Sequence, residues 1–568
     1  MQNTPPVLHP SLQAALLAAL CVCSSPLPAQ NPAQDSAAPT STIEHLSGLV
    51  VNSTDGKPVA RVLVTSPDRR MAVLTDFQGR FSFEYRRPIL APSRENFGGL
   101  SSLYLLAGST VPVQLMVRKP GFVTNSVTLR LPAASPDAAA PPLQLKIVPA
   151  AVLSGHVDPE AGDPPSGMTV QLRHRQIQDG AATWAQANSA RVNSRGEFRF
   201  PNLQPGDYKI MTASWTAPEA NRSPPPDSSP GLMPAFYPGG DSLDVATPIH
   251  VAPGETVTAN LAPRSATFYH VEVPVTGIDP TKGFNATLLP GDSTFPVRVN
   301  MQNHAVEAYL PTGSYTIRIG SFGGPSPVTA IAHLQVNGAP VHMPAVAPLA
   351  GADLPILVHR DFTGDSANLQ NMEGPSVNIG LQPVDSSGTA VGSAPQQPGE
   401  GDESLRLQNV SEGRYRVVAY PHAGYIASIA SGGVDLLREP LTVGASGSAA
   451  PIEITLRDDF ASLAGRVSPS DATQPQAADA DPIFVQFIPL DRLEGPSWGN
   501  IVTMDRNFTM PSLAPGSYLV LASHQQMQNL EFRNRDVLDH LLTKGTVVAL
   551  SAGQRANVQV PLMPEEGN

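Results

Sequence analysis

The chain has 568 residues, of which 41% are hydrophobic, 60 are proline and 46 are glycine, and its formal net charge is -12. At about 150 residues per domain, this length predicts roughly four domains. Proline and glycine stay below the share that is typical of disorder but provide many turns. An acidic chain without a block of lysine or arginine argues against nucleic acid and against anionic membrane surfaces as partners.

The N-terminus predicts export. Residues 11–23 form an apolar run that is too short to span a bilayer comfortably. Small residues follow it, and Leu27-Pro28-Ala29 resembles a signal-peptidase site. We therefore predict a signal peptide over residues 1–29 and a linker over residues 30–42. The mature protein is expected in the periplasm, at the cell surface or outside the cell.

Both cysteines, Cys21 and Cys23, lie within the predicted signal peptide. The mature chain is therefore expected to have neither disulfides nor thiolate chemistry. No later stretch approaches 18 uncharged apolar residues, so we expect no transmembrane segment after the signal peptide.

The segment GEFRFPNLQPGDYKIMTAS, residues 196–214, contains two strand-like runs joined by a turn. Its first five residues alternate apolar and polar, which predicts a strand with one buried face. Pro205 and Gly206 provide the turn, and Tyr208 restarts the alternation with Lys209 turned outward. The string Leu-x-Pro-Gly-x-Tyr resembles the tyrosine corner of Greek-key sandwiches, where the phenol bonds a backbone group across the turn. We predict a structural role for Tyr208.

The same phrase returns about every hundred residues. Its later copies end in Gly-Ser-Tyr315, Gly-Arg-Tyr415 and Gly-Ser-Tyr518, and a related Asp-Phe-Gln-Gly-Arg-Phe string precedes them at residues 76–81. A period of this length corresponds to a domain rather than to one rung of a solenoid. Three copies also begin alike, with glycine in the third position of the strings that start at residues 46, 153 and 463.

We therefore predict an all-β protein, a tandem array of about five Ig-like or prealbumin-like β-sandwich domains with one short helix near the C-terminus. The predicted units are unit 1 (43–149), unit 2 (150–262), unit 3 (263–346), unit 4 (347–458) and unit 5 (459–564). Strand-like runs on either side of the boundaries lie only a few residues apart, which indicates a stiff array. The helix is expected over residues 534–545, and residues 216–234 and 393–403 are expected to be exposed loops.

Unit 1 carries a family resemblance. Its strings Gly48-Leu-Val-Val, Gly56-Lys-Pro-Val-Ala and Thr75-Asp-Phe-Gln-Gly-Arg-Phe resemble the carboxypeptidase regulatory-like domain. That family is a prealbumin-like (transthyretin-like) β-sandwich, and units 2 and 5 are similar to the same superfamily of carbohydrate-binding-like folds. The whole chain resembles multi-copy exported bacterial proteins of this type. The resemblance implies a fold, and it does not fix an activity.

We searched the sequence for a metal or catalytic site. His304 and Glu307 form a His-x-x-Glu pair with His422 downstream, but in the predicted strand the pair would point to opposite faces. His270 and Glu272 would share a strand face, where an exposed pair without a third ligand is expected. No nucleophile elbow, phosphate loop or zinc motif occurs. We therefore predict that the protein is not an enzyme and has no metal and no cofactor.

Carbohydrate sites on sandwiches place aromatic faces against sugar rings. Trp215, before the proline-rich loop of unit 2, and Tyr237, which closes that loop, would form a platform at one end of the sandwich. Trp498, in a predicted loop of unit 5, is a second candidate ligand-binding residue. The alternative interpretation is that these aromatic side chains hold long loops on the sandwich.

We therefore predict a non-catalytic exported protein that binds glycan at the cell envelope. The alternative function is a structural or protein-assembly scaffold or spacer of the envelope, with an envelope protein as partner. A third function is an accessory subunit of a peptidase.

Overall fold

The computed structural model describes most of the chain after residue 40. The described residues are 41–66, 69–88, 111–131, 143–160, 162, 167–178, 180–217, 224–278, 283–289, 294–321, 328–363, 377–384, 391–392, 405–444, 449–469, 483–493, 498–503, 505–525, 527 and 530–564. The predicted signal peptide lies outside them, as does the whole predicted loop at 393–403.

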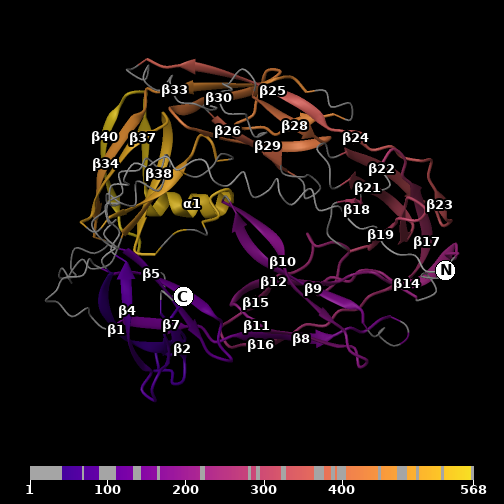
Figure 1. Cartoon of the computed structure of the whole chain (residues 1–568), viewed down its shortest axis with the longest axis horizontal. Coiled ribbons are helices and arrows are strands. Elements are labelled where there is room, and N and C mark those ends of the chain that lie inside the picture. Colours follow the sequence, from indigo (N-terminus) through magenta and orange to yellow (C-terminus); the bar gives the residue numbers. More distant parts are fainter. Residues whose placement is uncertain are drawn as a thin grey trace, which may run out of the picture.

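The described chain is all-β, with one helix, and its sheets pair into five sandwiches that follow one another along the sequence (Figure 1). Each sandwich has its own core of buried aliphatic and aromatic side chains drawn from both of its sheets. Independent cores of this size are what the hydrophobic effect requires of domains near a hundred residues long. The predicted fold class is confirmed.

Units 1 and 2 each combine a three-stranded and a four-stranded sheet. In unit 1 the sheets are β4-β1-β7 and β3-β2-β5-β6, and in unit 2 they are β11-β8-β16 and β10-β9-β12-β15. The strands of unit 1 are β1 (Ser41–Asn52), β2 (Leu63–Thr65), β3 (Ala72–Leu74), β4 (Arg80–Pro88), β5 (Val111–Arg118), β6 (Asn125–Leu131) and β7 (Leu143–Ile147). Those of unit 2 are β8 (Ala151–His156), β9 (Thr169–Gln178), β10 (Ala181–Arg191), β11 (Glu197–Leu203), β12 (Gly206–Thr212), β15 (Ile249–Val251) and β16 (Thr256–Thr258).

Units 3 and 4 have larger sheets. Unit 3 combines β13-β14-β17-β20-β19, with β23 beside β17, and β18-β21-β22-β24, whereas unit 4 combines β28-β25-β33-β30-β31 and β27-β26-β29-β32. The strands in and beside unit 3 are β13 (Trp215–Thr216), β14 (Ser228–Leu232), β17 (Ser265–Pro274), β18 (Phe284–Leu289), β19 (Val297–Asn300), β20 (Ala305–Leu310), β21 (Gly313–Ser321), β22 (Val328–Val336), β23 (Val341–His342) and β24 (Leu349–Ala350). Those of unit 4 are β25 (Ala352–Asp361), β26 (Val377–Pro383), β27 (Val391–Gly392), β28 (Arg406–Val410), β29 (Gly413–Pro421), β30 (Tyr425–Ser431), β31 (Val434–Asp435), β32 (Leu441–Val443) and β33 (Ile452–Arg457).

Unit 5 combines β37-β34-β40 with β36-β35-β38-β39. Its elements are β34 (Ala461–Ser468), β35 (Ile483–Pro489), β36 (Trp498–Thr503), β37 (Asn507–Leu513), β38 (Gly516–Ser523), α1 (Arg535–Lys544), β39 (Thr546–Leu550) and β40 (Arg555–Pro561). The predicted helix is confirmed: the Asn534 side chain accepts a hydrogen bond from the Asp536 amide, as an N-cap does. Leu538 and Leu541 of α1 pack on the outer face of the β38 sheet.

One topological feature recurs in every unit. The first strand of the sandwich pairs in parallel with a strand near the end of the unit, as β1 does with β7, β8 with β16, β17 with β23, β25 with β33, and β34 with β40. Because the two strands run in the same direction, the chain enters a unit at one end of this sheet and leaves it at the other end. The next unit begins after a short link, so that β33 ends at Arg457 and β34 begins at Ala461.

In units 1, 2 and 5, a glycine of the first strand lies under a phenylalanine ring of the neighbouring antiparallel strand. The pairs are Gly48 with Phe81, Gly155 with Phe198 and Gly465 with Phe508, where a Cβ on the glycine would lie 2.8, 2.7 and 2.4 Å from a ring carbon. A side chain larger than hydrogen has no room there, since the same Cβ would also meet a carbonyl oxygen of the chain beside it, at 2.4, 1.8 and 2.7 Å. The repeated glycine string that begins each of these units therefore contacts the repeated phenylalanine of the neighbouring strand.

The four repeated tyrosines form the predicted corners. Each phenol donates a hydrogen bond to the carbonyl four residues earlier: Tyr208 to Gln204 at 2.7 Å, Tyr315 to Pro311 at 2.9 Å, Tyr415 to Ser411 at 2.9 Å and Tyr518 to Ala514 at 2.7 Å. Burial raises the pKa of all four phenols, to about 12 for Tyr315 and Tyr518. The hydroxyls therefore stay protonated donors, and the structural role predicted for Tyr208 is confirmed.

The loop predicted at residues 216–234 is partly wrong. After Trp215 the chain leaves the sandwich of unit 2, and β14 pairs with β17 at the edge of the unit 3 sheet. Two bonds fix this crossing: the Tyr309 hydroxyl donates to the Pro226 carbonyl at 2.8 Å, and the His270 amide donates to the Asp227 carbonyl at 2.9 Å. Units 2 and 3 therefore share one sheet rather than a flexible tether.

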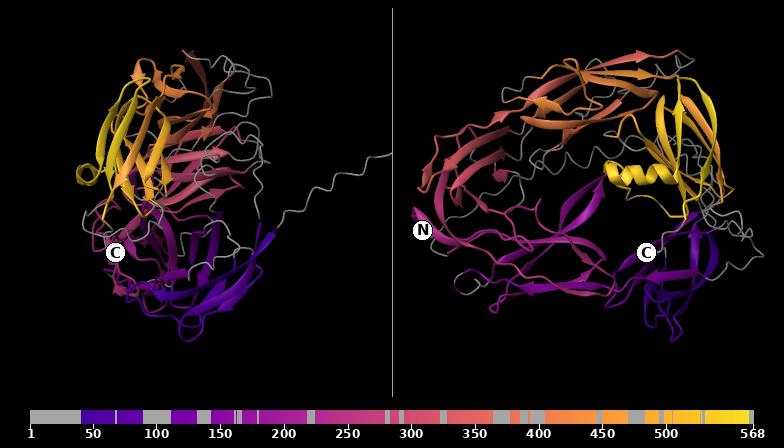
Figure 2. Two further views of the ribbon diagram at one scale, coloured as in Figure 1. Left: turned by 90° about the vertical axis from the view of Figure 1, so that its left-hand side faces the viewer. Right: turned by 180° about the vertical axis from the view of Figure 1, so that it is seen from behind.

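The five units are arranged around a closed path (Figure 2). The tip of the β9–β10 hairpin in unit 2 meets the segment before α1 in unit 5. There the Arg533 amide donates to the Gly180 carbonyl at 2.9 Å, and Arg175 forms an ion pair with Glu531. The ring of Phe532, 3% exposed, lies against Gly180, where a Cβ would come within 2.4 Å of it. We call this contact the unit 2–unit 5 closure.

Removing one corner hydroxyl should destabilise its unit. Tyr415→Phe leaves the Ser411 carbonyl without its donor, and we expect the free energy of unfolding to fall by about 1 to 2 kcal/mol. Tyr420→Phe is the matched control, because Tyr420 lies on the same strand, β29, with its side chain 56% exposed. Urea unfolding, followed by amide exchange in β29, measures both variants. Equal losses in the two would contradict the role of the corner.

Candidate functional site

The sequence predicts that Lys209 turns outward, but its side chain is only 5% exposed. It does point away from the core of unit 2, but residues 236–246 fold over it. Its ammonium group donates to the carbonyls of Leu243 and Asp244 at 2.8 and 3.4 Å, and it lies 4.7 Å from the centre of the Trp184 ring. A cation over an indole face is stabilised by the quadrupole of the ring.

Burial lowers the pKa of Lys209, and the nearby Asp244 carboxylate opposes that shift. A buried amine of lowered pKa is the kind of group that marks active sites. Here, however, its donors hold a loop in place. The same loop packs Phe236 and Ala246 on Met211, which shares the outer strand face with Lys209. The sequence signal for this covering loop was Met211, an apolar residue on the strand face that was expected to be exposed.

Of the two residues of the predicted glycan platform, Tyr237 lies in this loop and Trp215 lies in strand β13. Trp215 and Tyr237 are both half-buried, and both pack against the core of unit 2. Trp498 was expected in a loop, but it is the first residue of strand β36, where it pairs with Phe487. Glycan binding by Trp215, Tyr237 and Trp498 stays a prediction.

A second polar cluster lies where β14, β17, β20 and β23 meet. His270 of β17 is buried, 5% exposed, and its Nε2 atom has no hydrogen-bond partner among the described residues. Its ring lies 5.3 Å from the ring of Tyr309 and 6.3 Å from that of His342. The exposed pair expected for His270 and Glu272 is therefore wrong for His270. The added strands β14 and β23 bury it, and neither is evident from its local sequence.

The carboxylates around His270 are already engaged. Glu272 pairs with His342 at 3.1 Å, and Glu307 accepts a hydrogen bond from the Asn300 side chain at 2.8 Å. Burial lowers the pKa of His270, and the attraction of Glu307 and Glu272 offsets this only in part. His270 is thus a neutral buried ring above its pKa. The cluster joins side chains from β17, β19, β20 and β23 of the shared sheet.

His304 was expected in a strand, and that prediction is wrong. It ends the turn before β20 with a φ of 49°, whereas Glu307 lies within β20. Across the described residues, no three histidine, cysteine, aspartate or glutamate side chains are grouped so that they could hold a metal ion.

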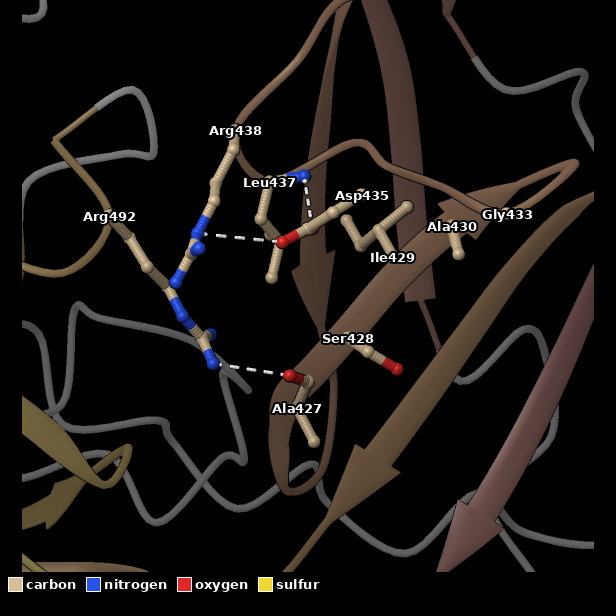
Figure 3. Close-up of a pocket in the computed structure, with 9 residues that line it drawn as sticks. All are labelled: Ala427, Ser428, Ile429, Ala430, Gly433, Asp435, Leu437, Arg438 and Arg492. Atoms are coloured by element: carbon tan, nitrogen blue, oxygen red, sulfur yellow. Dashed lines mark hydrogen bonds and ion pairs between the residues drawn. The ribbon is translucent and has the colours of Figure 1, made fainter.

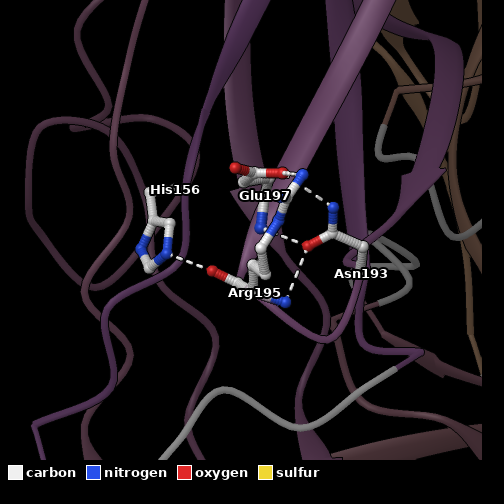
Figure 4. A network of polar contacts seen from close by, with 4 residues as sticks. All are labelled: His156, Asn193, Arg195 and Glu197. Carbon is white, nitrogen blue, oxygen red and sulfur yellow. Dashed lines mark hydrogen bonds and ion pairs between the residues drawn. The ribbon is translucent and has the colours of Figure 1, made fainter.

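An exposed network joins His156, Asn193, Arg195 and Glu197 (Figure 4). The Asn193 Oδ1 atom accepts from the amides of Arg195 and Glu197, both at 2.9 Å, and its amide nitrogen donates to the Glu197 carboxylate at 2.9 Å. This hydrogen bond and the one from Arg195 lower the pKa of Glu197. His156 bonds the Arg195 carbonyl. Since each of these groups closes the turn between β10 and β11, we assign the network to the fold.

A cavity of about 320 Å³ lies at the junction of units 4 and 5 (Figure 3). Strand β30 and the turn after β31 form one side, and Arg492, from the turn after β35, forms the other. The Arg492 guanidinium donates to the carbonyls of Ile426 and Ala427 at 2.8 and 3.1 Å. Arg438 also lines the cavity, with its Nε atom 3.6 Å from the Asp435 carboxylate.

In the part of the chain that the structure describes, no helix has the length and apolar character needed to cross a membrane.

No family model matches the chain, and no curated protein matches it. Among solved structures, the minor pilin GBS52 of Streptococcus agalactiae is 12% identical over 42% of this chain and 99% of that chain, with a TM-score of 0.18. The TIE protein of Bacillus anthracis is 9% identical over 94% of this chain and 76% of that chain, with a TM-score of 0.16. The shaft pilin SpaA of Lactobacillus rhamnosus GG is 12% identical over 39% of this chain and 98% of that chain, with a TM-score of 0.16. TM-scores this low do not establish a shared function.

Acid should destabilise the shared sheet through His270. The unfolded chain takes up this proton at the ordinary pKa of 6.5, whereas the folded chain takes it up only at a lower pH. Between these values the unfolded state holds the extra proton, so the free energy of unfolding falls as the pH drops below 6.5. His270→Gln should remove this part of the pH dependence.

Thermal unfolding across this pH range measures the effect. His359→Gln is the control, because His359 is an exposed histidine on β25 in another unit. The interpretation fails if His270→Gln keeps the full slope of the parent protein.

Proposed function

We propose that this chain is a non-catalytic, exported structural protein of the cell envelope. Its five sandwiches form a closed scaffold that holds partner proteins at fixed relative positions. The single observation that carries this proposal is the unit 2–unit 5 closure. Units that each bind glycan on their own do not need a contact between unit 2 and unit 5, whereas a scaffold of fixed shape does.

The contact surfaces between units support the proposal. Units 2 and 3 share a sheet through β14, and Arg492 of unit 5 bonds two carbonyls of unit 4. Thr329 of unit 3 bonds Ser411 of unit 4 at 3.2 Å. These three junctions therefore carry specific hydrogen bonds in addition to short links, and relative motion of units 2 to 5 is restricted.

The polar groups with unusual environments also favour a structural role. Lys209, His270 and the four corner tyrosines are all used to hold loops and strands in place. Strongly perturbed groups can serve an ion-pair or packing network as well as catalysis. Export rests on the predicted signal peptide over residues 1–29.

Breaking the closure should open the array. Gly180→Leu combined with Glu531→Arg places a side chain against the Phe532 ring and replaces the ion pair by two like charges. We expect small-angle X-ray scattering to give a larger radius of gyration and a larger maximum dimension. Gly239→Ala is the matched control, because nothing lies within 4 Å of a Cβ at that exposed loop position. An unchanged scattering profile would contradict a closure that determines the shape of the molecule.

Binding to polysaccharide separates the two main functions. A scaffold predicts that the mature chain is not retained on envelope or plant polysaccharides in affinity electrophoresis. Retention that is lost in a Trp215→Ala, Tyr237→Ala double variant, while Trp184→Phe keeps it, would instead establish glycan binding and overturn the proposal.

A further inference from the structure

The cavity between units 4 and 5 carries an excess of positive charge. The Arg438 and Arg492 guanidinium groups line it together with one carboxylate, Asp435 (Figure 3). Arginine stays protonated at every physiological pH, so the three groups leave one positive charge uncompensated. This is unusual on a chain whose formal net charge is -12.

The carboxylate is held by its own turn. One oxygen of Asp435 accepts from the Leu437 amide at 3.0 Å, and the other lies 3.6 Å from Arg438 Nε. Asp435 therefore neutralises Arg438 only weakly, because a contact of this length between exposed side chains is worth little.

Both arginines have hydrogen-bond donors to spare. A guanidinium has five N–H groups, and Arg492 uses one on each of two carbonyls. Arg438 directs only its Nε atom at Asp435. Because the Ile426 and Ala427 carbonyls hold Arg492 in place, its remaining donors are pre-ordered beside the cavity, and little entropy is lost when a ligand accepts from them.

We propose that this cavity binds a small monocarboxylate with a short apolar side chain. The planar guanidinium matches the two oxygens of a carboxylate, and the single uncompensated positive charge matches its single negative charge. A phosphate dianion would leave net negative charge beside Asp435. Ala427, Ala430 and Leu437 supply an apolar wall for the rest of the ligand.

The size of the cavity limits the ligand. At about 320 Å³ it lies at the small end of the range of roughly 300 to 1,000 Å³ for small-molecule sites. A ligand there would touch Arg438 of unit 4 and Arg492 of unit 5 at once. Its binding would therefore stabilise the junction of the two units as well as fill the site.

The test is isothermal titration calorimetry of the mature chain with N-acetylleucine. Its amide, N-acetylleucinamide, serves as a neutral probe of the same shape, and inorganic phosphate as a competing anion. We expect saturable binding of the acid alone. Arg438→Gln should weaken it about tenfold, the effect of losing a charge-assisted hydrogen bond.

Arg414→Gln, at an exposed arginine of β29 in the same unit, is the matched control and should bind as the parent protein does. Arg438 is exposed, so its substitution leaves the packing of the junction intact. Equal binding of acid and amide, tighter binding of phosphate, an unchanged affinity in Arg438→Gln or no binding at millimolar acid would each overturn the proposal.

Discussion

The parallel pairing between the first strand and a late strand of each unit is the constraint on which the architecture depends. It brings the two ends of a unit to one sheet, so a unit closes on itself before the chain moves on. In units 1, 2 and 5 a glycine makes this closure tight, because only hydrogen fits between the phenylalanine ring and the neighbouring carbonyl. Because the late strand runs parallel to the first, the chain leaves at the far end of the sheet, where the next unit begins after a short link, and short links limit how neighbouring units can turn.

Local signals in the sequence were enough to predict the fold class and the turns. The Gly-x-Tyr phrase predicted the corners because the phenol bonds a carbonyl only four residues away. The helix at residues 535–544 was evident because its cap and its apolar side lie within one short segment. In both cases the interacting groups lie within a few residues of one another, so a short sequence pattern contains all of them.

The errors have the opposite cause. The alternating pattern of its strand places His270 on the outer face, yet β14 and β23, each more than thirty residues away along the chain, cover it. Lys209 is buried by a loop that folds back over the outer face of its sheet, and the sequence signal was the apolar Met211 beside it. The cavity at the junction of units 4 and 5, and the closure, join side chains from separate units. No period or motif encodes such contacts, since they depend on how whole domains meet.

The contact between Gly180 and Arg533 also has a mechanical consequence. Units 3 and 4 lie between these two points along the chain, so the contact forms a bypass around both of them. Tension applied across the described termini would pass through units 1, 2 and 5, while the intervening pair stays slack. Units 3 and 4 would bear load only after the contact between Gly180 and Arg533 broke. The molecule would then lengthen in one abrupt step before any of its domains had to unfold.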